Sequence, residues 1–424
     1  MRLAVVGGGW AGLATAVRAT EAGHRVTLFE MAAQWGGRAR GVDVDGLALD
    51  NGQHILIGAY TRTLALMATV GADAGALLHR QPLELRYPDG RGLRMPAAPA
   101  WLGFGAAVAG CVGWTWRDRL ALMQAAAGWA LRGFTCPAEW TVQRLCGHLP
   151  GAVRQLLIDP LCVAALNTPA PQASARVFLR VLRDALFSGR GSADLLLPRA
   201  SLDRLLPEPA AQWLQAHGAT LVLRSRVSSL MSSDSGWQLD GQAFDAVVLA
   251  CSAGEAARLV RPHAAAWAQT AEGVGYEPIV TVYLHAEGGR LPCPMTALLE
   301  SSDAPAQFAF DLGALGGPRD VFAFVVSGAR HWVEQGLDAT GQAVLRQAVS
   351  ALGPAAWPRP PSVLRVLAEK RATFRCTPQL QRPAAWVARR LVAAGDHVEG
   401  PYPATLEGAV RSAEAALAAL TADA

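Results

Sequence analysis

The chain has 424 residues, of which 51% are hydrophobic and 17% charged, and its formal net charge is +4. This composition excludes a disordered chain and a basic nucleic-acid-binding tail, so we expect no nucleic-acid partner. The length suits two domains better than one core. The seven cysteines show no CxxC or metal-finger spacing. Together with the lack of a signal peptide, their odd number predicts reduced thiols in a cytoplasmic protein without a metal site.

The chain begins with a short apolar run at 3–6, which predicts a strand, followed by Gly7, Gly9 and Gly12 and a helical pattern over 13–22. These glycines have the spacing GxGxxG of a dinucleotide-binding turn. In such a turn Gly7 permits the tight bend, Gly9 lets the backbone approach a pyrophosphate, and Gly12 permits close packing of helix on strand. The helix N-terminus would then face the phosphates.

A second predicted strand at 26–29 ends at Glu30, which lies 18 residues after Gly12. An acidic residue near this spacing binds a ribose hydroxyl in dinucleotide folds. The stretch alone leaves two alternatives open, an NAD-binding protein and an ordinary doubly wound protein with a glycine-rich turn.

The loop after Glu30 reads Gln34-Trp35-Gly36-Gly37-Arg38. Adjacent glycines let the backbone pass close beneath a cofactor, and Arg38 places a fixed positive charge near a phosphate or a flavin. We therefore interpret Gly36, Gly37 and Arg38 as cofactor-binding residues.

A polar cluster, Asp50-Asn51-Gly52-Gln53-His54, follows in a loop-rich stretch. His54 could donate a proton near neutral pH, and Asp50 could do so if an apolar pocket keeps it protonated. The alternative is that both side chains only hold the loop by hydrogen bonds to the backbone. Other polar candidates without a positional argument are Tyr60, Asp311 and Arg375.

Residues 82–200 are apolar, rich in tryptophan and predicted to be mostly helical. Residues 95–116 carry no charge, but prolines and glycines interrupt them, which argues against a membrane-spanning helix. They could line a substrate cavity. They could instead dock on a bilayer surface, since Trp101 and Trp116 crowd the segment and Arg117 and Arg119 follow it.

The remaining elements suggest two interleaved domains. Strands are expected at 219–223, 227–231, 237–239, 246–251, 279–284, 321–326 and 391–394, with helices at 340–352 and about 406–420. We assign 1–80, 200–271 and 386–424 to a cofactor-binding domain, and 81–199 and 272–385 to a substrate-binding domain.

The last predicted strand ends at Gly395-Asp396. A carboxylate cannot face a phosphate without a donor between them, so Asp396 suits a ribityl hydroxyl, or a water or amide beside the pyrophosphate. The helix from Leu406 could point its N-terminus at the pyrimidine of a flavin. His397 could lie near the flavin, but a surface or capping role is the favoured interpretation. Cys251 is interpreted as a buried small hydrophobe.

Taken in order, the glycine turn, Glu30, Gly36-Gly37-Arg38 and Gly395-Asp396 resemble the flavin amine oxidase and phytoene desaturase superfamily. Within it, residues 7–13, 49–60 and 395–409 resemble the hydroxysqualene dehydroxylases of hopanoid synthesis, also described as squalene-associated FAD-dependent desaturases. The resemblance implies an α/β fold, in which a Rossmann-type FAD-binding domain is interleaved with an α+β substrate domain. FAD would be held non-covalently, with the backbone of Val227 reading the adenine from a strand.

The resemblance also implies a reaction, in which hydride from reduced FAD replaces the hydroxyl group of hydroxysqualene to give squalene and water. The partners implied are hydroxysqualene or a related C30 isoprenoid, a reductant of FAD, and upstream squalene-pathway enzymes. Alternatives are a carotenoid-type desaturase or amine oxidase, and a flavin-binding scaffold for isoprenoid enzymes. The expected location is cytoplasmic, and a peripheral association with the inner face of the cytoplasmic membrane stays open.

Overall fold

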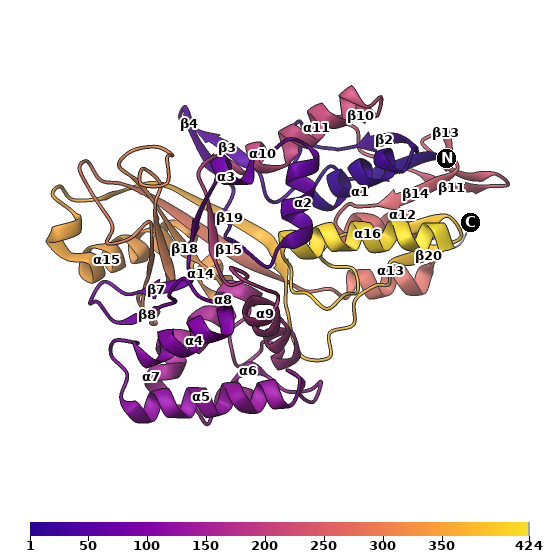
Figure 1. The fold of residues 1–424 in the computed structure, drawn as a ribbon. Coiled ribbons are helices and arrows are strands. Elements are labelled where there is room, and N and C mark those ends of the chain that lie inside the picture. Colours follow the sequence, from indigo (N-terminus) through magenta and orange to yellow (C-terminus); the bar gives the residue numbers. More distant parts are fainter. Residues whose placement is uncertain (423–424) are drawn as a thin grey trace.

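A six-stranded sheet in the order β10-β2-β1-β14-β21-β20 forms the centre of one domain in the computed structural model, which describes residues 1–422 (Figure 1). Its strands are β1 (Arg2–Val6), β2 (Arg25–Phe29), β10 (Thr220–Val222), β14 (Ala246–Leu249), β20 (Trp386–Ala388) and β21 (Leu391–Ala393). All pairings are parallel except that of β20 with β21, and Val5 of β1 pairs with Leu28 and Val248. The sheet therefore unites the two ends of the chain with its middle.

Apolar residues on both faces bury this sheet. Leu3 and Val5 of β1 pack in the core beneath one helical layer, whereas Ala4 and Val6 pack in the core on the opposite face. The first layer is α1 (Trp10–Glu21), α11 (Pro207–Ala216) and α16 (Leu406–Ala422). The second is α12 (Ala253–Val260), α13 (Ala265–Glu272) and the small sheet β11 (Leu230–Ser233), β12 (Gly236–Leu239) and β13 (Gln242–Phe244). Such burial on both faces is typical of parallel sheets.

A five-stranded sheet in the order β16-β17-β18-β15-β19 forms the second domain. Its strands are β15 (Tyr276–His285), β16 (Met295–Ala297), β17 (Phe308–Asp311), β18 (Val321–Val326) and β19 (Ser362–Phe374). Helix α15 (Leu337–Ala356), which follows α14 (Arg330–Gln335), packs on the face that carries Val282 and Phe324. The opposite face, with Tyr283 and Val325, belongs to the core shared with the helical region.

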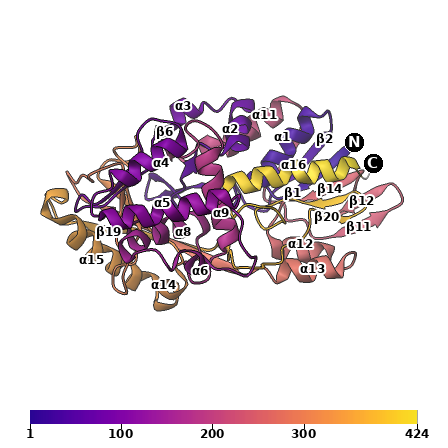
Figure 2. The same ribbon diagram turned by 60° about the horizontal axis from the view of Figure 1, so that its bottom comes forward.

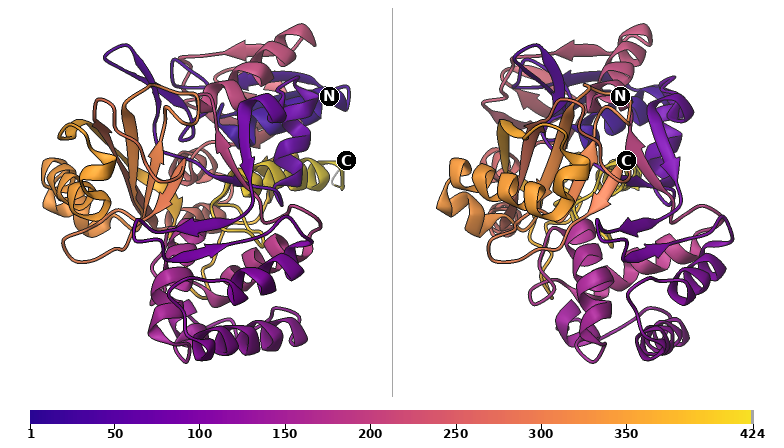
Figure 3. Two further views of the ribbon diagram at one scale, coloured as in Figure 1. Left: turned by 60° about the vertical axis from the view of Figure 1, so that its left-hand side comes forward. Right: turned by 90° about the vertical axis from the view of Figure 1, so that its left-hand side faces the viewer.

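A helical region lies at the bottom in Figures 1 and 3, below both sheets. It contains α4 (Ala100–Ala109), α5 (Trp116–Leu131), α6 (Val142–Cys146), α7 (Gly151–Val153), a π-helical turn at Arg154–Ile158, α8 (Asp159–Leu166) and α9 (Ala175–Phe187). The elements that connect it to the first domain are β3 (Gly41–Val44), β4 (Leu47–Asp50), β5 (Leu56–Ile57), α2 (Thr61–Thr69), α3 (Ala74–Leu77), β6 (Leu78–Gln81), β7 (Glu84–Arg86), β8 (Gly92–Arg94), β9 (Leu195–Pro198) and α10 (Leu202–Leu205). Among helices within residues 1–422, none is both long and apolar enough to cross a membrane.

The predicted fold class is confirmed, and several predicted elements need correction. Val227 lies in an extended segment outside any strand, because the strand expected at 227–231 begins only at Leu230. The stretch 82–200 contains short strands as well as helices, and the long strand β19 was not foreseen.

Candidate functional site

A cavity of about 550 Å³ lies where the parallel strands of the first sheet end. Residues that directly follow β1, β2, β14 and β21 line it: Gly7, Glu30, Ala250, Cys251, Gly395 and Asp396. Helix α8 and strands β15 and β19 of the second domain supply the opposite wall, through residues such as Val163, Ile279 and Thr373. Ligands of open α/β sheets bind at this edge.

Glycine occupies three positions of the first turn, and the structural reason differs at each of them. Gly7 has φ of 110°, and a Cβ there would lie 2.6 Å from the Ala250 carbonyl oxygen. A Cβ on Gly12 would lie 1.7 Å from the Gly7 carbonyl oxygen, so Gly12 keeps the helix against the turn, and it does not line the cavity. Gly9 lines the cavity, and the nearest atom to a Cβ there is Gly37 Cα at 3.8 Å. The protein itself therefore tolerates a side chain at Gly9, and the open space suits a ligand.

The second glycine pair continues the same surface. The Gly36 N–H donates to the Gly8 carbonyl at 2.9 Å, and a Cβ on Gly37 would lie 3.1 Å from Gly9 Cα. Gly36 and Gly37 have φ of 106° and 63°, which favours glycine at both positions. At Gly9, Gly36 and Gly37 the two loops thus approach through backbone atoms, as the close passage beneath a cofactor requires.

Glu30 lines the same cavity with its carboxylate buried. It accepts hydrogen bonds from the Gly8 N–H at 2.6 Å and the Ala32 N–H at 2.7 Å. Each carboxylate oxygen can accept a further bond, so Glu30 can still bind a ribose hydroxyl.

Arg38 and Asp396, 358 residues apart, form an ion pair with an N–O distance of 2.5 Å. Arg38 also donates to the carbonyls of Arg371 and Ala372, each at 3.0 Å. Burial alone would raise the pKa of Asp396, but the nearby Arg38 charge outweighs it and holds that pKa well below its usual range. Arg38 therefore supplies a donor beside Asp396, and its pairing ties the first loop to the segment after the last parallel strand.

His397 is buried and lines the cavity, so the expectation of a surface histidine was wrong. Gly395 has φ of 154°, and a Cβ there would lie 2.6 Å from the His397 ring, so the glycine makes room for the imidazole. The His397 Nε2 has no hydrogen-bond partner among residues 1–422. A buried polar atom without a partner at a cavity wall is consistent with a contact that a bound ligand would supply.

Val227 lines the cavity at the end marked by Glu30 and by the ion pair Arg226–Glu255 at 2.7 Å. Its carbonyl accepts a hydrogen bond from Arg258 at 2.7 Å. The carbonyl oxygen can accept a second bond, and the backbone contact expected with an adenine stays a prediction.

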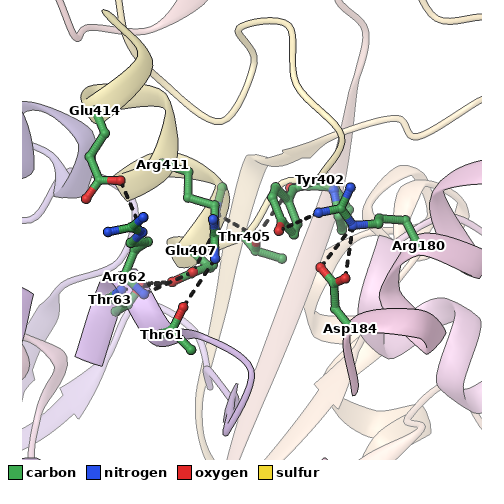
Figure 4. A network of polar contacts seen from close by, with 12 residues as sticks. Thr61, Arg62, Thr63, Arg180, Asp184, Tyr402, Thr405, Glu407, Arg411 and Glu414 are labelled. Atoms are coloured by element: carbon green, nitrogen blue, oxygen red, sulfur yellow. Dashed lines mark hydrogen bonds and ion pairs between the residues drawn. The ribbon is translucent and has the colours of Figure 1, made fainter. Parts of the chain in front are cut away.

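The start of α16 also borders the cavity, where Thr405, Leu406 and Ala409 line it. Figure 4 shows the network that fixes this segment. The Glu407 carboxylate accepts the backbone N–H groups of Arg62 at 3.1 Å and Thr63 at 2.8 Å, at the N-terminus of α2. Arg411 binds the same carboxylate at 2.8 Å. Glu407 thus satisfies unpaired donors of α2 while holding the N-terminus of α16 in place.

Tyr402 extends this network into the helical region. Its ring lies between the guanidinium groups of Arg180 and Arg411, at 4.9 and 5.1 Å, and its hydroxyl accepts a hydrogen bond from Arg180 at 2.9 Å. Arg180 also pairs with Asp184 at 3.0 Å (Figure 4). The segment 402–409, of which Ala404, Thr405, Leu406 and Ala409 line the cavity, is therefore braced by the first domain and by the helical region.

Replacing Glu407 with glutamine should destabilise the fold by about 1–3 kcal/mol, because an amide NH₂ would face donors inside a buried site. FAD affinity should fall as well, since the N-terminus of α16 loses its anchor. Thermal unfolding and FAD titration measure both effects. Glu414→Gln is the matched control on the same helix, because Glu414 makes longer, more exposed pairs with Arg62 at 3.4 Å and with Arg18 at 3.8 Å. Equal effects of the two substitutions would contradict the role of Glu407.

Asp50 does not line the cavity. Its carboxylate accepts the Leu202 N–H at 2.9 Å, at the start of α10, and its carbonyl accepts the Tyr283 hydroxyl at 2.8 Å. Burial, with a smaller contribution from Asp203, raises the pKa of Asp50 to about 7. The geometry favours the alternative in which Asp50 positions the loop, while its role as an acid stays a prediction.

The substitution Asp50→Asn should stabilise the protein at neutral and alkaline pH, since the asparagine oxygen can still accept the Leu202 N–H without a buried charge. The raised pKa of Asp50 in the folded state makes the wild type lose stability as pH rises from about 4 to about 7. The advantage of the variant should therefore be small near pH 4, grow to at most about 4 kcal/mol near pH 7, and then level off. Denaturant unfolding at several pH values measures it, and a pH-independent difference would refute the assignment.

His54 does line the cavity, beside Asn51, Gly52 and Ile55. Its Nδ1 lies 2.8 Å from the Gly52 carbonyl, which can only accept, so Nδ1 carries the proton. Burial, together with the Arg38 charge, lowers the pKa of His54. The imidazole is thus neutral at pH 7, with Nε2 as a hydrogen-bond acceptor.

The other polar candidates are distributed differently. Tyr60 lines the cavity, whereas Asp311 and Arg375 do not. Cys251 lines it too, and burial raises the pKa of its thiol to about 12, which suits an inert side chain.

Sequence reasoning missed Asn167, a buried cavity residue with φ of 46° at the end of α8. An asparagine followed closely by a proline, as in Asn167-Thr168-Pro169, is a helix-end signal that could have placed it.

Residues 10–420 match the sequence profile of a family described as flavin containing amine oxidoreductase. Two relatives named hydroxysqualene dehydroxylase, from Sinorhizobium fredii and Rhodopseudomonas palustris, are 27% and 28% identical over alignments that span 96% of this chain and 95% of each relative. A solved oxidoreductase from Methanosarcina mazei has a TM-score of 0.75 over 99% of this chain and 100% of its own, at 14% identity, which shows a shared fold. The resemblance inferred from the motifs is confirmed.

Proposed function

Because this chain belongs to the family of flavin-containing amine oxidoreductases and FAD is its cofactor, we propose that it acts on hydroxysqualene in the synthesis of squalene. In the proposed reaction a carbon–oxygen bond breaks and a carbon–hydrogen bond forms. The hydroxyl group leaves as water, with a proton taken up from the solvent. The relatives named hydroxysqualene dehydroxylase support this choice of substrate.

The residues along the cavity fit FAD from one end to the other. Glu30 and Val227 suit the adenosine, the backbone of Gly7, Gly9 and Gly36 suits the pyrophosphate, and the segment from Leu406 suits the flavin. Reduced FAD supplies, when bound, the hydride that replaces the hydroxyl group. The N-terminus of α16 would stabilise negative charge on the reduced ring.

The observation that carries the proposal is that the cavity lined by His54 also has apolar side chains in its wall. These include Ile55, Val163, Ala164, Ala165, Ile279 and Ala404. Such a wall suits a hydrocarbon and excludes water from a carbon centre that loses its hydroxyl. The neutral His54 offers Nε2 as an acceptor for the one polar group of such a substrate. In this proposal His54 orients the hydroxyl group rather than protonating it.

His54→Leu should lower kcat/KM by roughly 2–10-fold, the effect of one lost uncharged hydrogen bond, and leave FAD bound. Because the pKa of His54 is lowered, the wild-type rate should show no inflection near pH 6.5 from this residue. A steady-state pH profile of both proteins measures this. An inflection near pH 6.5 that disappears in the variant would show that His54 acts as an acid instead.

The direct test reduces the purified holoprotein without oxygen and adds hydroxysqualene. Flavin reoxidation with formation of squalene is the expected result. Bound, reduced FAD that yields no squalene would overturn the proposal. Reduction of the oxidised flavin by a carotenoid precursor or by an amine would favour the desaturase or the amine oxidase, and a flavin unchanged by all substrates would favour the scaffold.

A further inference from the structure

Two neighbouring helices of the helical region expose large apolar side chains on their outer side. Figure 1 shows α5 at the lower edge of the molecule, and Figure 2, in which that edge comes forward, shows α4 and α5 next to each other. The exposed side chains are Trp101 and Leu102 of α4, Val112 between the helices, Trp116, Leu120, Met123 and Leu131 of α5, and Phe187 at the end of α9. We call this set the α4–α5 face.

The exposed residues of α5 form one stripe along its length. Trp116, Leu120, Met123 and Leu131 follow helical spacing, and Trp116 is 67% exposed and Leu131 89% exposed. The opposite side of α5 carries the buried side chains, which include Leu122 and Trp129. Helix α5 is therefore apolar on two sides, and packing in the core accounts for only one of them.

The stripe of α5 continues onto its neighbours. A Cβ placed on Gly105 of α4 would lie 3.8 Å from the end of the Met123 side chain, so the two helices are in contact at the surface. At the far end of α5, the ring centroids of Phe134 and Phe187 lie 5.3 Å apart. The exposed side chains thus form a continuous face, and contiguous apolar faces mark interaction surfaces.

The charges around this face are mostly positive. Residues 95–139 contain Arg117, Arg119 and Arg132 and two acids, Asp118 and Glu139. Asp118 is buried in a capping box, where its carboxylate accepts the Thr115 N–H at 2.8 Å and hydroxyl at 2.7 Å. The Arg117 guanidinium lies over the Trp116 ring at 5.4 Å. The exposed Trp101 and Trp116, together with the exposed Arg117 and Arg132 near the two ends of α5, suit a headgroup region with negative charge.

The nearby hairpin β7–β8 does not supply the missing negative charge. Its Asp89 pairs with Arg91 at 2.7 Å, and its Glu84 pairs with Arg86 at 2.9 Å. A second copy packed on this face around a twofold axis would bring arginines toward arginines, with Glu139 as the only exposed acid of residues 95–139, which is unfavourable. The charges therefore favour a lipid surface over a second copy of the chain.

We propose that the α4–α5 face docks on a lipid bilayer that contains anionic lipids, with both helices lying in the interface. The apolar stripe enters the boundary between headgroups and acyl chains, and the arginines remain at the level of the phosphates. The proposal is carried by this surface and holds whichever substrate the cavity accepts.

The test is co-sedimentation of the FAD-loaded protein with vesicles. One set is phosphatidylcholine alone, and the other has equal parts phosphatidylcholine and phosphatidylglycerol. The stripe variant carries Leu120→Gln, Met123→Gln and Leu131→Gln. The matched control carries Met231→Gln, Leu299→Gln and Val349→Gln, which are also exposed apolar residues but lie on other elements. Circular dichroism and flavin content confirm that each variant is folded.

We expect the wild type and the control to bind the mixed vesicles, and the stripe variant to bind at least about tenfold more weakly. Arg117→Gln with Arg132→Gln should weaken binding to the mixed vesicles and leave the weaker binding to phosphatidylcholine unchanged. Wild-type protein that stays in the supernatant, or a stripe variant that binds as tightly as the wild type, would overturn the proposal. A dimer that only the stripe variant dissociates would do so too, by assigning the face to a second copy.

Discussion

Replacing Gly9 with alanine should leave the protein folded and strongly weaken its binding of FAD. The nearest protein atom to the new Cβ, Gly37 Cα, would lie at 3.8 Å, an ordinary contact. The same methyl group would occupy the side of the cavity where the backbone must approach the pyrophosphate. A steric cost of roughly 1–3 kcal/mol corresponds to about 5- to 150-fold weaker binding. Titration of the apoprotein with FAD, followed by flavin fluorescence, measures the change.

Two other glycines make this result interpretable. Gly151→Ala is the matched control, because Gly151 lies outside the cavity with ordinary backbone angles and no atom within 4 Å of a new Cβ. It should change neither stability nor FAD affinity appreciably. Gly12→Ala should destabilise the fold itself rather than only FAD binding, because its Cβ would lie 1.7 Å from the Gly7 carbonyl oxygen and force α1 away from the turn. If Gly9→Ala bound FAD like the wild type, the pyrophosphate would not lie over Gly9.

The first thirty residues could be predicted closely because their structure is determined locally. An apolar strand, a glycine turn and a helix each follow from neighbouring residues, and β1, α1 and β2 lie where expected. Strand β19 shows the opposite case. Its sequence Ser362–Phe374 contains leucine, alanine, glutamate, lysine and arginine, which favour helix, yet pairing with β15 makes it a strand of 13 residues. The partner that decides its conformation lies about 80 residues away and leaves no local signal.

The residues of the candidate site also fall into two groups, those that local sequence patterns place correctly and those whose position depends on distant segments. Motif spacing placed Gly7, Gly9, Glu30 and Gly395 on one cavity, because each follows a strand of the same parallel sheet. Spacing could not place Asp50, four residues from His54 in a loop. The Asp50 carboxylate turns to the start of α10, 152 residues later in the chain, and leaves His54 alone at the cavity wall. Which side chains meet across such separations depends on packing between domains.

Breaking the ion pair between Arg38 and Asp396 should have the largest effect on stability when the arginine is removed. Arg38→Ala leaves a carboxylate with 8% side-chain exposure without its cation, whereas Asp396→Asn leaves a guanidinium with 39% exposure that water can reach. Loss of one partner of a buried pair costs about 3–5 kcal/mol, and the partial exposure of Arg38 places our expectation near 3 kcal/mol. Asp396→Asn should cost clearly less. Denaturant unfolding of the apoprotein measures both without interference from FAD binding.

The double variant Arg38→Ala with Asp396→Asn distinguishes the interaction between the two side chains from their other contacts. It should be more stable than Arg38→Ala alone, because the unpaired buried charge is gone, and the two effects should not add. The pH dependence gives an independent check. Since the pKa of Asp396 is lowered in the folded protein, the pair stabilises fully above the ordinary carboxyl range and loses its contribution as the pH falls. The stability gap between the wild type and Arg38→Ala should therefore narrow below about pH 4. A gap that is constant into the acid range, with additive single effects, would show that Arg38 acts only through its bonds to the Arg371 and Ala372 carbonyls.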